Sequence, residues 1–287
     1  MMEEPVAPSK ETKTRSCTGV ELHCYYWYPE DKVPLAAVFL CHGFGEYLAT
    51  YDRVTRALLK AGFFVFGHDH VGFGRSGGKR ARIDSIDQYS KDVECHVASV
   101  KGRLKDIPMF IVGHSMGGAI AVNTGIQYPN LFDGVVLLSP GLAIDKKFDT
   151  SVLRFLGKTM ARIAPGAGLI QLKADAITSD LAIIEKYSSD PLIYKGRMKA
   201  GWLNAFRLGV AQVNKGISSV KWPFLCIQGG IDPWIPASEI KRIMETAASP
   251  DKTIVIVENA LHRVHDEPNG VGDDVCRQTV EWIQQRI

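Results

Sequence analysis

Short apolar runs alternate with longer helical patterns along most of this chain, and this alternation is the feature that most constrains its fold. The runs are rich in Val, Ile and Phe and predict strands at 21–28, 35–41, 63–67, 109–113, 134–139, 224–228 and 253–257. The helical patterns lie between them, at 51–61, 86–104, 116–127, 238–248 and 274–286. Apolar strands that alternate with helices predict a mostly parallel sheet covered by helices on both faces.

The alternation is interrupted once, over residues 142–213, where no clean strand is present. A connection of this length without structure of its own is uncommon in a compact domain, so the segment predicts an inserted helical cap. It carries 11 Lys and Arg against 6 Asp and Glu, whereas the whole chain has 34 against 31. We therefore expect a core of residues 19–141 and 214–287, a basic cap of residues 142–213 and a flexible leader of residues 1–18.

Charge and hydropathy exclude several classes of protein. The net charge of +3 is too small for a dedicated nucleic-acid binder. Apolar stretches such as 35–41 are far shorter than the roughly 18 residues of a membrane span. The polar N-terminal segment does not have the pattern of a signal peptide. Six scattered cysteines without a Cys-x-x-Cys pair indicate reduced thiols in a cytoplasmic protein.

The segment GHSMG at residues 113–117 has the pattern G-x-S-x-G, between a predicted strand and a predicted helix. That context predicts a nucleophile elbow, in which a sharp turn exposes the serine hydroxyl. The turn strains the serine backbone, and the glycines on either side let the neighbouring chains pass. We therefore expect Ser115 to be a nucleophile. The alternative is a glycine-rich turn with a spectator serine, which would not require a strand before the motif and a helix after it.

A nucleophilic serine needs a general base, and the base needs an acid that orients it. Asp232 and His262 come after Ser115 in the order serine, acid, histidine, and each follows a predicted strand. Because the carboxyl ends of parallel strands meet at one edge of the sheet, we expect these three side chains to lie close together. His265 is an alternative base three residues further on.

The segment HGFG at residues 42–45 follows another predicted strand and matches the His-Gly-x-Gly form of an oxyanion loop. The amides of Phe44 and Met116 would then bind the negative charge of a tetrahedral intermediate. Glu46 follows directly, and its carboxylate would oppose that charge unless it were directed toward a substrate or a cation. A substrate contact and a structural salt bridge are both open for Glu46.

Several segments together resemble the monoacylglycerol lipase family of α/β-hydrolases, from about Gly19 to the C-terminus. They are HGFGE, DHVGFGRSGG, GHSMGGAIA, LLSPGL, SSDPL, IDPWIP and NALHRVHDEP. The resemblance implies an α/β-hydrolase fold, hydrolysis of monoacylglycerols to fatty acid and glycerol without metal or cofactor, and a cap that touches membrane. It implies a catalytic triad of Ser115, Asp232 and His262, and glycerol contacts from Glu46, Tyr187 and His265.

The chain departs from the family pattern in two places. The family often has His and Arg shortly after the glutamate, where this chain has Tyr47 and Thr50. The cysteines usual in the cap and beside the triad acid are absent, and Tyr194 and Ile235 stand near those places. Lysophospholipase, carboxylesterase and acyltransferase activities on the same fold are alternatives. A non-enzymatic binding protein is a further alternative, which the intact serine and histidine disfavour.

Three motifs that suggest cofactor or metal sites have a simpler explanation as loop structure. Residues 72–77 satisfy G-x-G-x-x-G, but no helical pattern begins there, as a dinucleotide site would require. The GGKR segment lacks the first glycine and the Ser or Thr of a P-loop. His68, Asp69 and His70 have no further cluster of ligands that would complete a zinc site. We expect neither a cofactor nor a metal.

One segment of the cap has the pattern of an amphipathic helix. Its apolar stripe comprises Val152, Leu153, Leu156, Met160 and Ile163, with Phe148 and Phe155 nearby, and its basic face comprises Arg154, Lys158 and Arg162. The stripe either packs on the core or contacts a membrane. The net charge of +5 on the insert and a lipid substrate favour transient, peripheral contact with anionic bilayers. We expect no nucleic-acid partner and no obligate protein partner.

Overall fold

The computed structural model describes residues 6–30, 33–104, 106–143 and 150–287, without the side chains of residues 151–156. The strands of its main sheet are β1 (Lys10–Arg15), β2 (Glu21–Trp27), β3 (Ala37–Cys41), β4 (Phe64–His68), β5 (Met109–His114), β6 (Gly134–Leu138), β9 (Phe224–Gly229) and β10 (Lys252–Val257). The core helices are α1 (Asp52–Lys60), α2 (Ile86–Lys101), α3 (Met116–Gln127), α7 (Ala237–Glu245) and α8 (Val271–Gln284). Every strand and core helix predicted from the sequence is present, with ends shifted by at most three residues.

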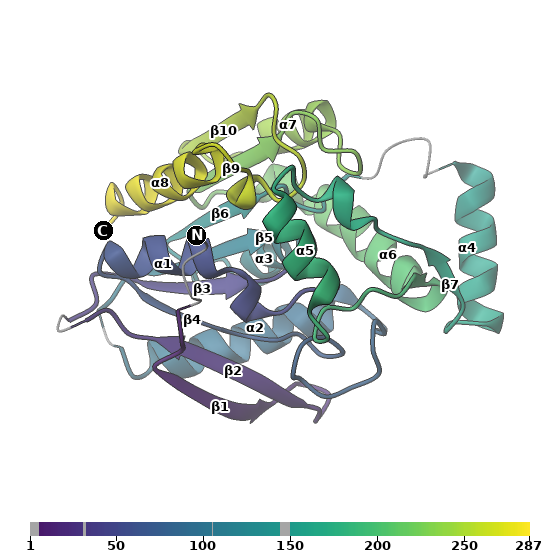
Figure 1. Cartoon of the computed structure of the whole chain (residues 1–287), viewed down its shortest axis with the longest axis horizontal. Coiled ribbons are helices and arrows are strands. Elements are labelled where there is room, and N and C mark those ends of the chain that lie inside the picture. The colour runs from purple at the N-terminus through teal and green to yellow at the C-terminus, as the bar shows by residue number, and fades with distance from the viewer. Residues whose placement is uncertain (1–5, 31–32, 105, 144–149) are drawn as a thin grey trace.

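The eight strands form one sheet in the order β1-β2-β4-β3-β5-β6-β9-β10 (Figure 1). The six strands from β4 to β10 in this order run parallel to one another. Only β2 breaks the pattern, because it is antiparallel to both β1 and β4. The predicted mostly parallel sheet with helices on both faces is confirmed.

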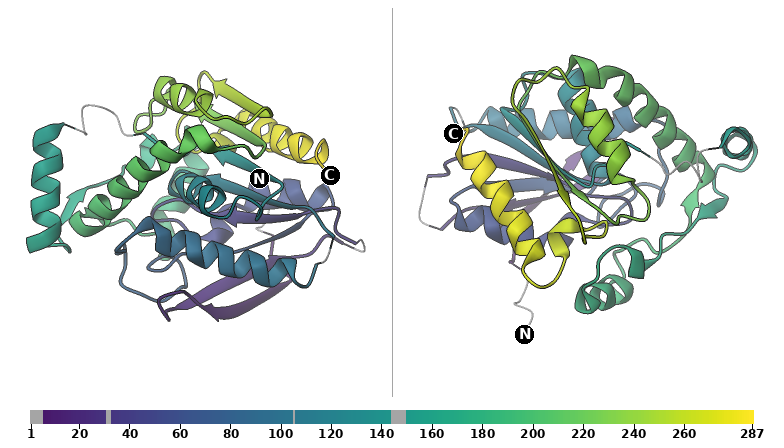
Figure 2. Two further views of the ribbon diagram at one scale, coloured as in Figure 1. Left: turned by 180° about the vertical axis from the view of Figure 1, so that it is seen from behind. Right: turned by 90° about the horizontal axis from the view of Figure 1, so that it is seen from above.

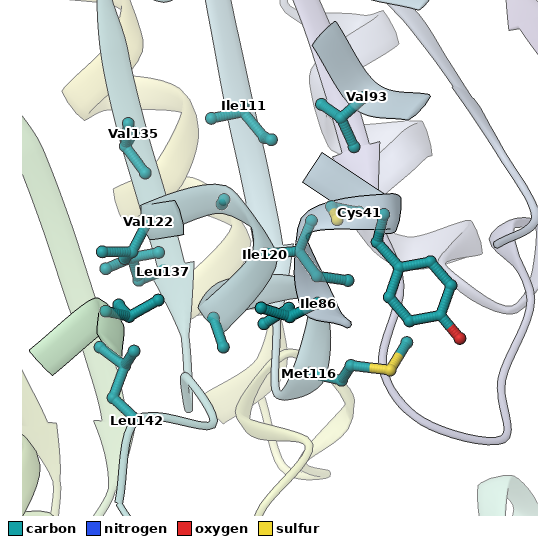
Figure 3. Close-up of a cluster of buried hydrophobic side chains, with 14 of the residues drawn as sticks. Cys41, Ile86, Val93, Ile111, Met116, Ile120, Val122, Val135, Leu137 and Leu142 are labelled. Atoms are coloured by element: carbon teal, nitrogen blue, oxygen red, sulfur yellow. The ribbon is translucent and has the colours of Figure 1, made fainter. Parts of the chain in front are cut away.

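Side chains that alternate along each strand build a separate hydrophobic core on each face of the sheet. In β3, Phe39 and Cys41 join the cluster that contains α2, α3 and α7, whereas Val38 and Leu40 join the cluster that contains α1 and α8. Figure 3 shows part of the first cluster, in which side chains of β5, β6 and α3 pack together. Since both faces are filled, reactive side chains can gather only where the strands end.

The first strand corrects the expectation of a flexible leader over residues 1–18. Lys10–Arg15 form β1, which pairs with β2 so that Lys10 lies opposite Tyr26 and Arg15 opposite Glu21. The segment was not predicted as a strand because its side chains are polar, and all except Thr12 are exposed. Charged side chains on an edge strand discourage pairing with another chain. The core therefore includes residues 10–15.

The described part of the insert between β6 and β9 includes the α-helices α4 (Ser151–Ile163), α5 (Leu181–Ser189) and α6 (Ala200–Gly216) and the short strands β7 (Gly168–Ile170) and β8 (Met198–Lys199). Helix α6 packs into the core, because Trp202, Val210 and Val213 belong to the same cluster as α3. Helix α4 lies at the outer margin of the insert, far from the sheet, as Figures 1 and 2 show from three sides. Within the described ranges, no helix combines the length and apolarity of a membrane span.

Candidate active site

Ser115 occupies the sharp turn between β5 and α3. Its φ of 53° and ψ of −119° are a strained combination for a residue with a side chain. The flanking glycines make the turn possible. A Cβ on Gly113 would lie 2.5 Å from the carbonyl oxygen of Gly117, and a Cβ on Gly117 would lie 2.0 Å from that of Cys41. The expected elbow geometry is therefore present around Ser115.

Three side chains that follow three different strands form one hydrogen-bonded chain. Ser115 Oγ lies 2.8 Å from Nε2 of His262, and Nδ1 of His262 lies 2.6 Å from Oδ2 of Asp232. The other carboxylate oxygen of Asp232 accepts hydrogen bonds from the amides of Trp234 and Ile235, both at 3.0 Å. With its Nδ1 proton held by Asp232, the imidazole can accept the serine proton at Nε2.

The environment of Asp232 favours its ionised form. Burial would raise the pKa of its carboxyl group, but His262 and the hydrogen bonds from His262 and the two amides outweigh burial and lower that pKa. Gln228 donates a further hydrogen bond to Oδ2 at 3.1 Å. An ionised carboxylate here would stabilise the imidazolium that forms when His262 takes up a proton.

The loop after β3 runs beside this turn. A Cβ on Gly43 would lie only 3.3 Å from the Cβ of Ser115. Met116 is the first residue of α3, where backbone N–H groups have no acceptor within the helix. Among the described residues, no group accepts a hydrogen bond from the amide of Phe44 or of Met116. Both amides are thus available to an oxyanion next to the serine hydroxyl.

Glu46, for which a substrate contact and a salt bridge were both open, forms a buried ion pair. Its Oε1 accepts a hydrogen bond from Nη1 of Arg263. Its Oε2 accepts hydrogen bonds from the Gly43 amide, at 3.0 Å, and from the Tyr51 hydroxyl, and His114 Nδ1 lies 3.3 Å away. Burial would raise the pKa of Glu46, but Arg263 and His114 hold it well below its ordinary value. The geometry favours the salt bridge.

The other two predicted glycerol contacts lie near the same loop. His265 is fully buried and stacks on Tyr51, with ring centroids 5.2 Å apart. Neither of its ring nitrogens has a hydrogen-bond partner within the described part of the chain. Burial and the charge of Arg263 lower its pKa well below the ordinary value. Tyr187 of α5 is half-buried, and its hydroxyl would lie 3.5 Å from a Cβ on Gly45.

Arg263, the residue after His262, was not among the site residues predicted from the sequence. Its guanidinium is 2% exposed and contacts Asp266 through Nε at 2.7 Å and Nη2 at 2.5 Å. Nη2 also donates to the carbonyl of Thr50 at 3.1 Å. The cation beside Glu46 therefore comes from the histidine loop and not from position 50. The available signal was an arginine in a loop expected to reach the same edge of the sheet.

The motifs that suggested cofactors have structural roles. The carboxylate of Asp69 accepts hydrogen bonds from the amides of Leu48 and Arg75, both at 2.8 Å, and so organises the glycine-rich loop after β4. The next helix, α2, begins only at Ile86. No group of three or more His, Cys, Asp or Glu side chains in the described ranges could hold a metal ion. All six cysteines are free thiols.

Comparisons with known proteins agree with this geometry. The family model of serine aminopeptidases, S33, matches residues 32–269. Human monoglyceride lipase is 33% identical over 268 residues, which cover 93% of this chain and 88% of that protein. Monoacylglycerol lipase of Mycolicibacterium smegmatis is 31% identical over 273 residues, which cover 94% and 95%.

Solved structures are similar over nearly the whole chain. Monoacylglycerol lipase of Paleococcus ferrophilus has a TM-score of 0.82 at 27% identity and covers 93% of this chain and 99% of its own. A soluble variant of monoglyceride lipase from Saccharomyces cerevisiae, in complex with a substrate analog, has a TM-score of 0.85 and covers 100% and 98%. At 21% identity, this second likeness concerns the fold. The predicted α/β-hydrolase fold is confirmed.

Proposed function

Because the chain belongs to the family described as serine aminopeptidase, S33, and has monoglyceride lipases of 31% and 33% identity among its relatives, we propose that it cleaves monoacylglycerols to a free fatty acid and glycerol. The resemblance to monoacylglycerol lipases is thereby confirmed. The observation that carries the proposal is the hydrogen-bonded chain from Ser115 through His262 to Asp232, beside the loop of residues 42–45.

The proposed reaction passes through an acyl-enzyme. Ser115 Oγ attacks the ester carbonyl while Nε2 of His262 takes the serine proton, and the amides of Phe44 and Met116 bind the oxyanion. His262 then protonates the leaving glycerol oxygen, and the acyl group stays on the serine. Water attacks the acyl-enzyme with the same base, which releases the fatty acid. Asp232 keeps the imidazole in the required tautomer and stabilises its cation.

We assign the glycerol contacts to Tyr187 and His265. The ring nitrogens of His265 have no hydrogen-bond partner among the described residues, although Asp266 Oδ2 lies 3.8 Å from Nε2. A buried polar group without a hydrogen bond favours a ligand that supplies one. We do not assign a direct glycerol contact to Glu46, because its carboxylate already accepts hydrogen bonds from Arg263, Tyr51 and Gly43.

Replacement of the nucleophile tests the proposal. We expect Ser115→Ala to lose turnover of a monoacylglycerol by about 10⁴-fold or more, without loss of folding. Ser219→Ala is the matched control, because this serine bonds only the Gly216 carbonyl in the described structure and lies outside the site. Near-normal activity of Ser115→Ala would contradict the assignment.

A substrate panel separates the proposed reaction from its alternatives on the same fold. Wild type should prefer monoacylglycerols over lysophospholipids and short-chain esters in kcat/KM. It should release fatty acid to water and not transfer it to an added alcohol. A preference for a lysophospholipid or a short-chain ester, or dominant transfer, would assign the chain to the corresponding alternative.

We also propose transient, peripheral contact of the cap with the cytoplasmic face of a membrane. The insert exposes apolar side chains at Ile163, Leu169 and Ile170, and Ile163 at the end of α4 is 73% exposed. Lys158 and Arg162 of α4 are exposed nearby. Apolar and basic side chains on one outer element suit an anionic bilayer. Most of the predicted stripe lies outside the described residues, namely Phe148 and the side chains of Val152, Leu153, Phe155 and Leu156.

Sedimentation with anionic liposomes tests this contact. Wild type should bind at low salt and dissociate at high salt, because the electrostatic part of the attraction is screened. The double variant Ile163→Asp, Ile170→Asp should bind less. Leu35→Asp is the control, since Leu35 is 54% exposed but precedes β3, at the opposite end of the strand from the oxyanion loop. Equal binding of all three proteins would show that this surface does not touch the bilayer.

A further inference from the structure

We propose that Arg263 is a positioning residue for the reaction: it neutralises Glu46, so that the loop of residues 42–45 can receive an oxyanion without an opposing charge. The inference rests on the proposed function, because it concerns the same site. It assigns a role to a residue that touches neither the serine hydroxyl nor the triad carboxylate in any described contact.

The carboxylate of Glu46 is hydrogen-bonded to the oxyanion loop that precedes it. Its Oε2 accepts a hydrogen bond from the Gly43 amide at 3.0 Å, and its own amide donates to the Gly43 carbonyl at 3.4 Å. Gly43 is bonded to Phe44, whose amide is one of the proposed oxyanion donors. An unpaired negative charge this close to the oxyanion loop would raise the activation barrier of acyl transfer, because the low dielectric of the site screens the charge poorly.

Glu46 also reaches the catalytic histidine through His114. Nδ1 of His114 lies 3.3 Å from Oε2 of Glu46, and Nε2 of the same ring lies 3.3 Å from the carbonyl oxygen of His262. The Tyr51 hydroxyl, 2.8 Å from His114 Nδ1, joins the same network. The pair of Glu46 and Arg263 thus touches both the oxyanion loop and the segment that carries the general base.

Arg263 is held so that its charge stays in place. Asp266 binds its Nε and Nη2, and the Thr50 carbonyl accepts from Nη2 at 3.1 Å. Its backbone amide donates to the carbonyl of Ile177, in the insert, at 2.6 Å. Burial would lower the pKa of Arg263, but Asp266 and Glu46 raise it well above the ordinary value. The guanidinium is therefore a permanent, fixed positive charge that Glu46 shares with Asp266.

Loss of this counter-charge has a definite consequence for Glu46. A buried carboxylate without a cation is costly, so its pKa rises and it takes up a proton at the lower end of the pH range. The titratable and charged groups that face Glu46 are Tyr51, His114, Arg263, His42, Tyr187 and His265, and Asp266 binds the same guanidinium from another side. Asp266 is present in both test variants, so the difference between them reports the charge of Glu46. Arg263 is the one member of this set with a permanent positive charge. Without it, Glu46 would be neutral below its raised pKa and would oppose the oxyanion above it.

The test compares Arg263→Met with the double variant Arg263→Met, Glu46→Gln in steady-state hydrolysis of a monoacylglycerol across pH. We expect Arg263→Met to lower kcat on the order of tenfold to hundredfold, less than the loss of an oxyanion donor, with a smaller change in KM. Its kcat should fall as pH rises through the raised pKa of Glu46. The double variant removes the charge and keeps the shape, so it should regain about tenfold and lose that pH step.

The controls separate this inference from the proposed function and from misfolding. Arg53 and Arg263 line one surface groove, but Arg53 pairs with Asp273 and donates to the Glu267 carbonyl. Arg53→Met therefore removes a nearby arginine that does not contact Glu46 in any described hydrogen bond or ion pair, and it should leave kcat unchanged. An inactive wild type would refute the proposed function. An active wild type with an unchanged Arg263→Met, or a double variant as slow as the single one, would overturn the inference alone. If Arg263→Met does not fold, Arg263→Lys replaces it: a wild-type pH profile supports the inference, and a new pH step contradicts it.

Discussion

Gly117 is the position at which a single methyl group should damage the site most directly. In Gly117→Ala, the new Cβ would lie 2.0 Å from the carbonyl oxygen of Cys41, 2.5 Å from its carbon and 2.7 Å from the carbonyl oxygen of His42. Contacts under 3.0 Å are essentially never seen for a real Cβ, so α3 and the end of β3 must separate by about 1 Å. All three clashing atoms are backbone atoms and cannot rotate away.

Moving α3 away from the end of β3 would affect the reaction, because each of the two elements holds part of the proposed active site. Helix α3 carries Met116 and follows Ser115, whereas His42 begins the loop that carries Phe44. A shift of about 1 Å between groups that hold one transition state can lower the rate about 10²-fold. Overpacking should also destabilise the fold by roughly 1–3 kcal/mol, less up to about 1 kcal/mol gained from the helix propensity of alanine.

The assay is kcat on a soluble ester, measured together with the melting temperature and the rate of labelling by a fluorophosphonate. Gly157→Ala is the matched control, since Gly157 also lies inside a helix, α4, but a Cβ there would meet nothing within 4 Å. The control should keep wild-type kcat and melt at the same or a higher temperature. A folded Gly117→Ala with kcat within threefold of wild type would refute the steric argument.

Two further predictions concern histidines. His262→Ala should lose turnover about as severely as Ser115→Ala, because triad members act as a unit. His265→Ala should mainly raise KM, by about tenfold for one lost hydrogen bond. Steady-state kinetics of both variants test this, and a collapse of kcat in His265→Ala alone would reverse the two roles. Burial lowers the pKa of His96 to about 4, from 6.5, so the unfolded chain binds this proton first as pH falls and its contribution to stability declines from pH 6.5 downward. Between pH 7 and 5 that decline in the free energy of unfolding is about 2 kcal/mol. Urea denaturation at the two pH values should therefore show a correspondingly smaller loss for His96→Gln than for wild type. An equal loss in the two proteins would contradict the lowered pKa.

The core could be predicted because its signals are local. Continuous apolar runs mark strands that are buried on both faces, and β3 to β6 and β9 are of this kind. Strand β10, at the edge of the sheet, has the apolar run but is only partly buried. The triad geometry followed from one additional rule, that parallel strands present their carboxyl ends at a common edge. Strand β1 has neither signal: its side chains are polar, and its pairing with β2 depends on an exposed edge. Strand β1 is held by backbone hydrogen bonds to β2, which a hydropathy pattern cannot predict.

The surroundings of the triad were harder to predict for a different reason. The partner of Glu46 lies 217 residues away in sequence, in a loop whose exact path no local pattern specifies. The sequence left two alternatives for this carboxylate, and only the position of Arg263 decides between them. The contribution of α6 to the core was missed similarly, since its apolar residues fit a cap helix and a core helix equally well.

The position of α6 sets a limit on how this protein can be re-engineered. Although α6 belongs to the insert by sequence, Trp202, Ala205 and Val213 fill the core beside α3, and Trp202 packs on Phe44 with ring centroids 4.3 Å apart. A graft that exchanged the whole insert for that of a relative would therefore also remove part of the recipient's hydrophobic core. The natural junctions of a chimaera are therefore the end of β6 and Lys199, so that α4, α5 and both short strands are exchanged and α6 stays with its host.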